Sequence, residues 1–361
     1  MQNRKNGKIE LLRFVLAVII MISHSANIPG VGSRFFPAGA FAVEFFFIVS
    51  GYLMMATIER SLISARSLST GKETFMFLKK KVVSIYPEIV ISWLFSIGVY
   101  AVSLDMGLKQ IVDQMTKSLG DLLLIKSTGL NLGSVNGVVW YISSMLLVMA
   151  ILYPLLKKHK DVMLYVVLPV GALIAFGYLC QEAGTMRKPD QWLGTFTRGL
   201  PRAFAEISIG VVCYPLAQKL MKSPLSKLGK LALTGIEWAI YITFFLFMYR
   251  GQSSKRDYFY VLFLAVGVMI TFSGQTIDSK WFNNKICYWL GKFSLPIYLT
   301  HAAWCKQLGI LMPEGTSIKK LMITYIGISV LSAFVVYFLS MLWRKIQPVL
   351  SKISKKLFLK A

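Results

Sequence analysis

Cysteine and histidine are scarce in this chain of 361 residues, which has four cysteines and three histidines. The cysteines are scattered without paired spacing, which excludes both a zinc-binding motif and a disulfide framework. We expect them to be packing residues, and we expect no metal site. They are Cys180, Cys213, Cys287 and Cys305.

Acidic residues are also few, with 16 Asp and Glu against 40 Lys and Arg, and the formal net charge is +24. A charge of this size would suit nucleic-acid binding, but the basic residues stand in short clusters between apolar runs, as in the cytoplasmic loops of membrane proteins. Hydrophobic residues make up 55% of the chain, and the mean hydropathy is +0.60. This composition is typical of a polytopic membrane protein, and we expect no nucleic-acid partner.

Ten apolar runs are candidates for membrane-spanning helices, since about 20 residues at 1.5 Å rise cross about 30 Å of hydrocarbon. We predict an all-α membrane bundle of about ten helices in a single domain (residues 1–345), followed by a basic amphipathic tail (346–361). Residues 106–125 have an amphipathic pattern, which predicts a helix lying on the bilayer surface. The predicted spans are residues 9–28, 37–58, 82–104, 134–156, 162–179, 199–221, 231–249, 258–272, 288–311 and 321–343.

The distribution of basic residues predicts the orientation of these spans. With both termini in the cytoplasm, the cytoplasmic segments hold about twice as many Lys and Arg residues as the outer loops. The first run has no small-residue cleavage site, so we expect it to be retained as a span. We therefore predict a multi-pass protein of the cell membrane with both termini cytoplasmic.

The first apolar run contains two ionisable residues, Arg13 and His24. Eleven residues at about 100° each return to nearly the same azimuth, so both side chains share one helix face, roughly 16 Å apart along the axis. An Arg near mid-helix costs about 2.5–3.5 kcal/mol, so such residues usually face a polar cavity. His is suited to accept a proton near neutral pH. The alternative is that Arg13 extends to the cytoplasmic surface and His24 lies at the outer interface.

Glu44 lies in the apolar run AVEFFFIVSGYLM, where an unpaired carboxylate would be costly. We therefore expect a partner, with Arg13 or His24 on the neighbouring helix as the natural candidate. A Glu44–His24 pair would orient the imidazole ring for acid–base chemistry. The alternative is a structural ion pair between Arg13 and Glu44.

Other polar residues within the spans have structural interpretations. Ser50 and Gly51 are small residues that permit close helix approach. Arg202 and Glu206 are spaced i, i+4 and so can satisfy each other. A lone histidine on an apolar helix, such as His301, is more often a structural hydrogen-bonding residue than a catalytic one.

Several segments together resemble the acyltransferase-3 family, the ten-helix membrane acyltransferases that modify cell-surface polysaccharides. The run LLRFVLAVIIMISHS matches its Arg-X10-His signature, with Arg13 and His24 at the two named positions. The run EFFFIVSGYLM resembles its acidic-x-Phe-Phe-x-x-Ser-Gly-Phe-Leu segment. Further similar segments are IYP (85–87), VWYISSMLLVMAILYPLL (139–156), RAFAEISIGV (202–211) and GKFSLPIYLTH (291–301).

Two positions depart from the family pattern. Ser84 stands where an Arg usually precedes Ile-Tyr-Pro, and Met145 stands where a Glu often follows the Trp segment. We also expect no extracytoplasmic esterase-like domain of the kind fused to some members. We therefore expect the membrane domain to complete the transfer, or to hand the acyl group to a separate protein.

The resemblance implies an O-acyltransferase that uses a cytoplasmic acyl-CoA, with acetyl-CoA as the expected donor. The acceptor would be a hydroxyl of a cell-surface polysaccharide or lipid-linked glycan, reached from a membrane-lipid environment. We expect His24 to be the general base, supported by Glu44, and Arg13 to bind the CoA pyrophosphate. Additional donor contacts are expected from Lys80, Lys81 and Lys8, and acceptor contacts from Trp140, Tyr141, Ser143, Tyr298 and His301.

A transporter is the alternative class. Ten spans with intramembrane charges and basic loops also suit a carrier of a glycan or lipid-linked intermediate. Against it, the sequence contains no internal repeat of fixed period, which many carriers have.

Overall fold

The structure is a computed structural model that describes residues 6–63, 68–130, 133–184, 188–252, 254–255 and 257–358, without the side chains of residue 183 and residues 348–358. This part of the chain is helical, with one isolated β-bridge between Trp192 and Thr197 and no strand. The helices are α1 (Gly7–His24), α2 (Ala42–Ile63), α3 (Thr70–Ser103), α4 (Leu108–Lys117), α5 (Leu119–Leu122), α6 (Trp140–Lys158), α7 (Lys160–Val162), the π-helix η5 (Met163–Val167), α8 (Leu168–Ala183), α9 (Gly199–Lys222), α10 (Lys227–Arg250), α11 (Asp257–Ser273), α12 (Lys285–Leu311) and α13 (Ile318–Phe358).

The predicted all-α membrane bundle is confirmed. Eight described segments are long and apolar enough to cross a bilayer, one of them formed by α7, η5 and α8 in succession. Two of the ten predicted spans fall outside this group. The helix α11 is apolar but has only 17 residues. The helix α12 is long enough but more polar, because it contains Lys292, His301 and Lys306.

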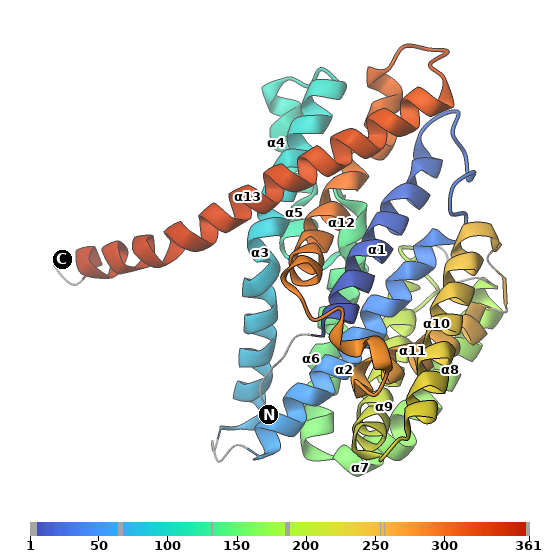
Figure 1. Cartoon of the computed structure of the whole chain (residues 1–361). Coiled ribbons are helices and arrows are strands. Elements are labelled where there is room, and N and C mark those ends of the chain that lie inside the picture. Colours follow the sequence, from blue (N-terminus) through green and yellow to red (C-terminus); the bar gives the residue numbers. More distant parts are fainter. Residues whose placement is uncertain are drawn as a thin grey trace.

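The helix α1 occupies the middle of the bundle, beside α2 and α12 (Figure 1). On one side α12 packs against α1, α3 and α13, and on the other side α2 packs against α9. The helix α9 in turn contacts α6, α8 and α11. The long helix α13 crosses the outside of α12 and α3, and its C-terminal end projects away from the bundle (Figure 1).

Close packing between α2 and α9 depends on glycine, as predicted for Gly51. A Cβ atom on Gly51 would lie 2.1 Å from the carbonyl oxygen of Ile207. Reciprocally, a Cβ atom on Gly210 would lie 2.0 Å from the carbonyl oxygen of Ile48. Small residues let membrane helices approach until their backbones touch, which replaces the hydrophobic driving force that lipid cannot supply.

The third span begins earlier than predicted. The predicted span covers residues 82–104, but α3 starts at Thr70, and the Ser69 side chain caps it by accepting a hydrogen bond from the Lys72 amide. The cap satisfies a backbone donor that has no partner within the helix. As a result, Lys80 and Lys81 lie on a helix rather than in a loop before the third span.

The amphipathic segment predicted at residues 106–125 forms two short helices, α4 and α5. The apolar side of α4 packs on the end of α3, where Ile111 and Met115 contact Trp93 and Ile97. The Trp93 indole donates a hydrogen bond of 3.0 Å to Ser118 Oγ at the junction of α4 and α5.

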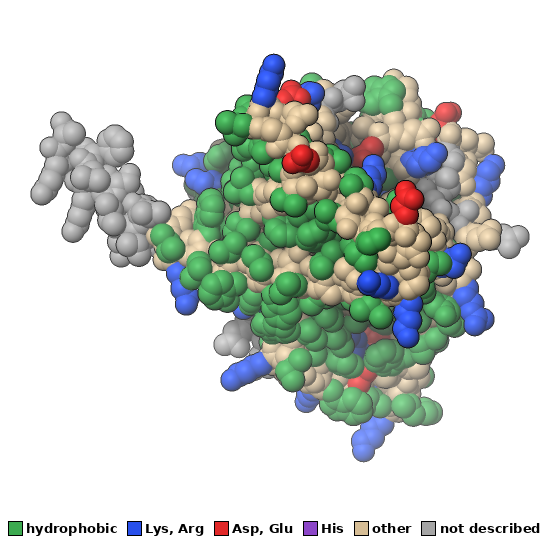
Figure 2. All heavy atoms as spheres, turned by 90° about the horizontal axis from the view of Figure 1, so that it is seen from above, with side chains coloured by type: hydrophobic (Ala, Val, Ile, Leu, Met, Phe, Trp, Pro, Cys, Tyr) green, Lys and Arg blue, Asp and Glu red, His purple; other side chains and the backbone are tan. Residues whose placement is uncertain are grey.

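Apolar side chains also cover the outside of the bundle. Seen from above, hydrophobic side chains cover much of the visible face, interspersed with backbone and other side chains, and many Lys and Arg side chains lie toward its margin (Figure 2). Leu173 on α8, Phe259 on α11 and Leu331 on α13 are each more than 60% exposed. Large apolar side chains on the outside are expected where lipid, not water, surrounds the protein.

Candidate functional site

A cavity of about 240 Å³ lies inside the bundle between α1, α2, α3, α6 and α12. Two basic side chains and several hydroxyl groups face it among apolar residues. The polar lining residues are Arg13, Ser50, Lys81, Ser84, Tyr141, Ser294 and Tyr298, and the apolar ones are Val43, Phe46, Val49, Leu53, Ile85, Ile142, Met145 and Leu295.

The positive charge of the cavity comes from Arg13 on α1 and Lys81 on α3. Arg13 pairs with Glu10 at 3.3 Å, one turn earlier on the same helix. Glu10 itself lies against α12, since a Cβ atom on Gly291 would come within 2.0 Å of its Oε2 atom. Lys81 has no ion pair with a described residue, and its ammonium lies 5.6 Å from the Phe77 ring. Within the described part of the chain, the Lys81 charge at the cavity is therefore not compensated by a carboxylate.

The other two lysines expected near a donor lie elsewhere. Lys80 is exposed and does not line the cavity. Lys8 is buried and lies 2.6 Å from the Glu237 carboxylate and 2.7 Å from the Asp278 carboxylate. Burial alone would raise the pKa of the Asp278 carboxyl, but hydrogen bonds from Lys8 and Trp238 outweigh it and hold that pKa below its usual value. The expectation that Lys8 faces a donor was therefore wrong.

Two tyrosines, Tyr141 and Tyr298, form one wall of the cavity. Their ring centroids are 6.0 Å apart at an angle of 77°. The Tyr141 hydroxyl lies 3.4 Å from Ser50 Oγ, and the Tyr298 hydroxyl donates a 2.8 Å hydrogen bond to the Val138 carbonyl. Tyr298 also contacts His301, one turn further along α12, with 6.1 Å between ring centroids.

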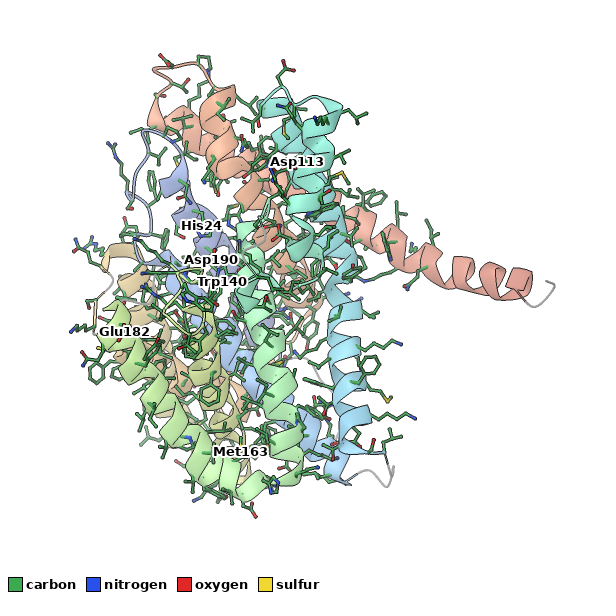
Figure 3. The ribbon with its side chains drawn as sticks, turned by 180° about the vertical axis from the view of Figure 1, so that it is seen from behind. His24, Asp113, Trp140, Met163, Glu182 and Asp190 are labelled. Atoms are coloured by element: carbon green, nitrogen blue, oxygen red, sulfur yellow. The ribbon has the colours of Figure 1, made fainter. Side chains whose placement is uncertain are left out.

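His24 and His301 form a pair. His24 Nδ1 lies 2.7 Å from His301 Nε2, and the rings stack with centroids 4.9 Å apart and planes at 23°. His301 is fully buried and His24 is half-buried. In Figure 3, His24 lies between the end of the molecule marked by Asp113 and the opposite end marked by Met163, nearer to Asp113. Neither histidine lines the cavity itself, and Tyr298 lies between the cavity and the pair.

Glu44 has a different partner from the two expected. Arg202 donates hydrogen bonds to both carboxylate oxygens of Glu44, the one from Nε being 3.1 Å long. Arg202 Nε also lies 3.5 Å from Glu206, as the i, i+4 spacing predicted. All three side chains are buried. The prediction that Glu44 pairs with Arg13 or His24 was wrong, because both of those residues have closer partners.

Trp140 and Ser143, expected to contact an acceptor, do not line the cavity. The Arg202 guanidinium lies 5.3 Å from the centre of the Trp140 ring, a cation–π distance. Ser143 is fully buried, and its hydroxyl accepts a 3.0 Å hydrogen bond from the Ser127 amide. Both residues support the fold around the buried charges.

Sequence reasoning missed several lining residues and one contact. Ser84 and Met145, the two departures from the family pattern, both line the cavity, as do Ser50 and Ser294. Because they fall within family motifs, Ser84 and Met145 could have been predicted from the sequence as cavity residues. By contrast, nothing in the sequence signalled that His301 contacts His24, since the two residues are 277 positions apart.

The fold and the site define a polytopic helical membrane protein with a basic cavity enclosed between its helices. Within the described residues, no three His, Cys, Asp or Glu side chains converge in a way that could hold a metal ion. The acyltransferase domain model of the acyltransferase-3 family matches residues 6–344, nearly the whole chain. The chain therefore belongs to this family and is a membrane acyltransferase. No curated protein and no solved structure matches it.

Proposed function

We propose that this protein transfers an acyl group from acyl-CoA, with acetyl-CoA as the donor, to a hydroxyl of a cell-surface or exported polysaccharide. The observation that carries the proposal is the cavity lined by Arg13 and Lys81, whose tyrosine wall contacts the histidine pair. The end with Arg13 and Lys81 suits an anion, and the end with the histidine pair suits a proton transfer. The transfer takes place in the cell membrane, with the Arg13 end of α1 facing the cytoplasm.

The donor's pyrophosphate binds to Arg13 and Lys81. A guanidinium binds phosphate oxygens with two parallel hydrogen bonds, and an ammonium adds a point charge. Lys81 supports this assignment, because no carboxylate among the described residues pairs with its partly buried ammonium, and an anionic ligand would offset the cost of that charge. Lys80, exposed on the same helix, contributes to the positive surface outside the cavity.

The size of the cavity favours the slender part of the donor. Pockets for drug-sized ligands usually measure about 300–1,000 Å³, and this one measures about 240 Å³. The pantetheine arm therefore enters the cavity along the wall formed by Tyr141 and Tyr298, while the adenosine stays outside. The roughly 16 Å from Arg13 to His24 along the helix is the distance that the extended arm spans.

His24 is the general base in this proposal. It takes the proton of the acceptor hydroxyl as the hydroxyl oxygen attacks the thioester carbonyl. The carbon–sulfur bond then breaks, and the leaving CoA thiolate takes up a proton, so that the reaction yields an ester and free CoA. Glu44 has no step in this reaction, because Arg202 occupies its carboxylate, and we assign it a structural role.

The test compares His24→Ala and Arg13→Gln with wild type in membranes, with surface-glycan O-acetylation measured by NMR. Loss of a positioned general base lowers rates by about 10²–10⁴-fold, and we expect His24→Ala to fall in this range. His159→Ala is the matched control, since His159 is exposed beyond α6 and should retain wild-type activity. Wild-type rates in both site variants, at equal expression, would overturn the proposal.

A further inference from the structure

The contact between His24 and His301 determines which nitrogen of each ring carries a proton. His301 Nδ1 lies 3.0 Å from the carbonyl oxygen of Ile297. A carbonyl oxygen can only accept, so His301 Nδ1 must carry the hydrogen in this contact. In a neutral His301 ring, Nε2 is then left with a lone pair.

The proton on His24 follows from the same reasoning. His301 Nε2 lies 2.7 Å from His24 Nδ1, and one of these two atoms must donate to the other. Since His301 Nε2 is the acceptor, His24 Nδ1 carries the hydrogen. The lone pair of His24 is therefore on Nε2, and no hydrogen bond with a described residue occupies that atom.

If His301 Nε2 instead donated to His24 Nδ1, His301 would carry a hydrogen on both ring nitrogens and would be an imidazolium cation. That ring is fully buried, and among the described residues it forms no ion pair with a carboxylate. A buried imidazolium without a counter-charge is strongly disfavoured. The neutral arrangement, with hydrogen bonds running from His24 to His301 to the Ile297 carbonyl, needs no such charge.

The surrounding helices hold the pair in place. A Cβ atom on Gly309 of α12 would lie 2.6 Å from Pro29, just after α1, so these segments are in direct contact. From α13, the Tyr325 hydroxyl donates a 2.9 Å hydrogen bond to the Met21 carbonyl and lies 3.3 Å from Cys305 Sγ. Tyr325 thus links α13 to α1 and α12, at positions within about one turn of His24 and of His301.

We propose that His301 is the positioning residue of the acyl transfer: it holds His24 in the Nδ1–H tautomer and directs the Nε2 lone pair toward the acceptor hydroxyl. The inference rests on the proposed function, in which His24 is the base. His301 itself does not touch the reacting atoms. This differs from the acceptor-binding role that the sequence predicted for it.

The protonation pattern can be measured without any activity. The chain has only three histidines, so ¹⁵N-histidine labelling of the full-length protein gives three pairs of ring signals, assigned with His159→Gln and His24→Ala. Neutral imidazole in water prefers the Nε2–H tautomer. We expect His24 to show the Nδ1–H tautomer in wild type and to return to the Nε2–H form in His301→Phe. An Nε2–H tautomer of His24 in wild type would overturn the inference.

Two substitutions at His301 separate positioning from packing. The Gln side chain in His301→Gln keeps an acceptor oxygen for His24 Nδ1–H, whereas the Phe in His301→Phe keeps the ring volume without an acceptor. We expect His301→Phe to lose about 10²-fold in kcat with little change in the KM for the donor, and His301→Gln to recover at least tenfold of that loss. Equal activity of the two variants would contradict positioning. If His24→Ala is inactive while both His301 variants are fully active, the proposed function stands and this inference alone fails.

Discussion

The Lys8 ammonium lies 2.6 Å from the Glu237 carboxylate, although the two residues are 229 positions apart in the sequence. Asp278 adds a second carboxylate at 2.7 Å, and its other oxygen accepts a hydrogen bond from the Trp238 indole. The network joins the start of α1 to α10 and to the segment before α12. It therefore fixes the helix that carries Arg13.

Replacing Lys8 should reduce stability rather than donor affinity. Lys8→Met leaves two buried carboxylates without their cation, and breaking a buried ion pair costs about 3–5 kcal/mol. Thermal unfolding of the purified protein in detergent measures this loss. Lys80→Met is the control, since Lys80 is exposed and should change the midpoint little. A Lys8→Met protein as stable as wild type would show that the network contributes nothing to folding.

The Glu44–Arg202–Glu206 cluster leads to a prediction about removing all three charged side chains together. Arg202→Met leaves both carboxylates buried and uncompensated, with an expected cost of about 3–5 kcal/mol. A neutral triple variant, Glu44→Gln with Arg202→Met and Glu206→Gln, should be more stable than Arg202→Met alone, because no buried charge remains. Unfolding midpoints under identical conditions give the comparison. A triple variant less stable than the single one would contradict the electrostatic explanation.

The glycine contact between α2 and α9 predicts a steric effect. Gly51→Ala places a methyl group 2.1 Å from the Ile207 carbonyl oxygen, so the two helices must separate and the variant should be less stable. Gly98→Ala on α3 is the matched control. A Cβ atom at Gly98 would meet nothing within 4 Å, and Ala favours a helix over Gly by about 1 kcal/mol. Thermal unfolding should show a lower midpoint for Gly51→Ala and no loss for Gly98→Ala. Equal midpoints of the two variants would contradict the close approach of α2 and α9.

The helices could be predicted from the sequence because lipid permits few alternatives. A chain in hydrocarbon must satisfy every backbone group within its own segment, so each long apolar run becomes a helix. The location of Arg13 on a cavity followed from the cost of placing a guanidinium in lipid. Tyr141 and Tyr298, which the sequence analysis predicted as acceptor contacts, both line the cavity.

The pairing of polar residues could not be predicted, because it depends on which helices become neighbours. Glu44 and Arg202 are 158 positions apart, and the sequence indicated Arg13 or His24, not Arg202, as the partner of Glu44. Only the packing of α2 on α9 decides between them. The same holds for Lys8, whose position before the first apolar run resembles that of an exposed basic residue.

The most direct test of the account is the response of the purified protein to acetyl-CoA. Ligand binding stabilises the folded state by RT ln(1 + [L]/Kd), about 2.7 kcal/mol at 100 times Kd. We predict that acetyl-CoA raises the unfolding temperature of wild type, and that Arg13→Gln weakens binding by about 10–100-fold, as expected for a charged hydrogen bond worth about 1.5–3 kcal/mol. Lys158→Gln is the control and should respond like wild type, since Lys158 is exposed at the end of α6 and does not line the cavity. A protein that ignores acetyl-CoA and is stabilised only by a glycan would contradict the account and indicate a carrier.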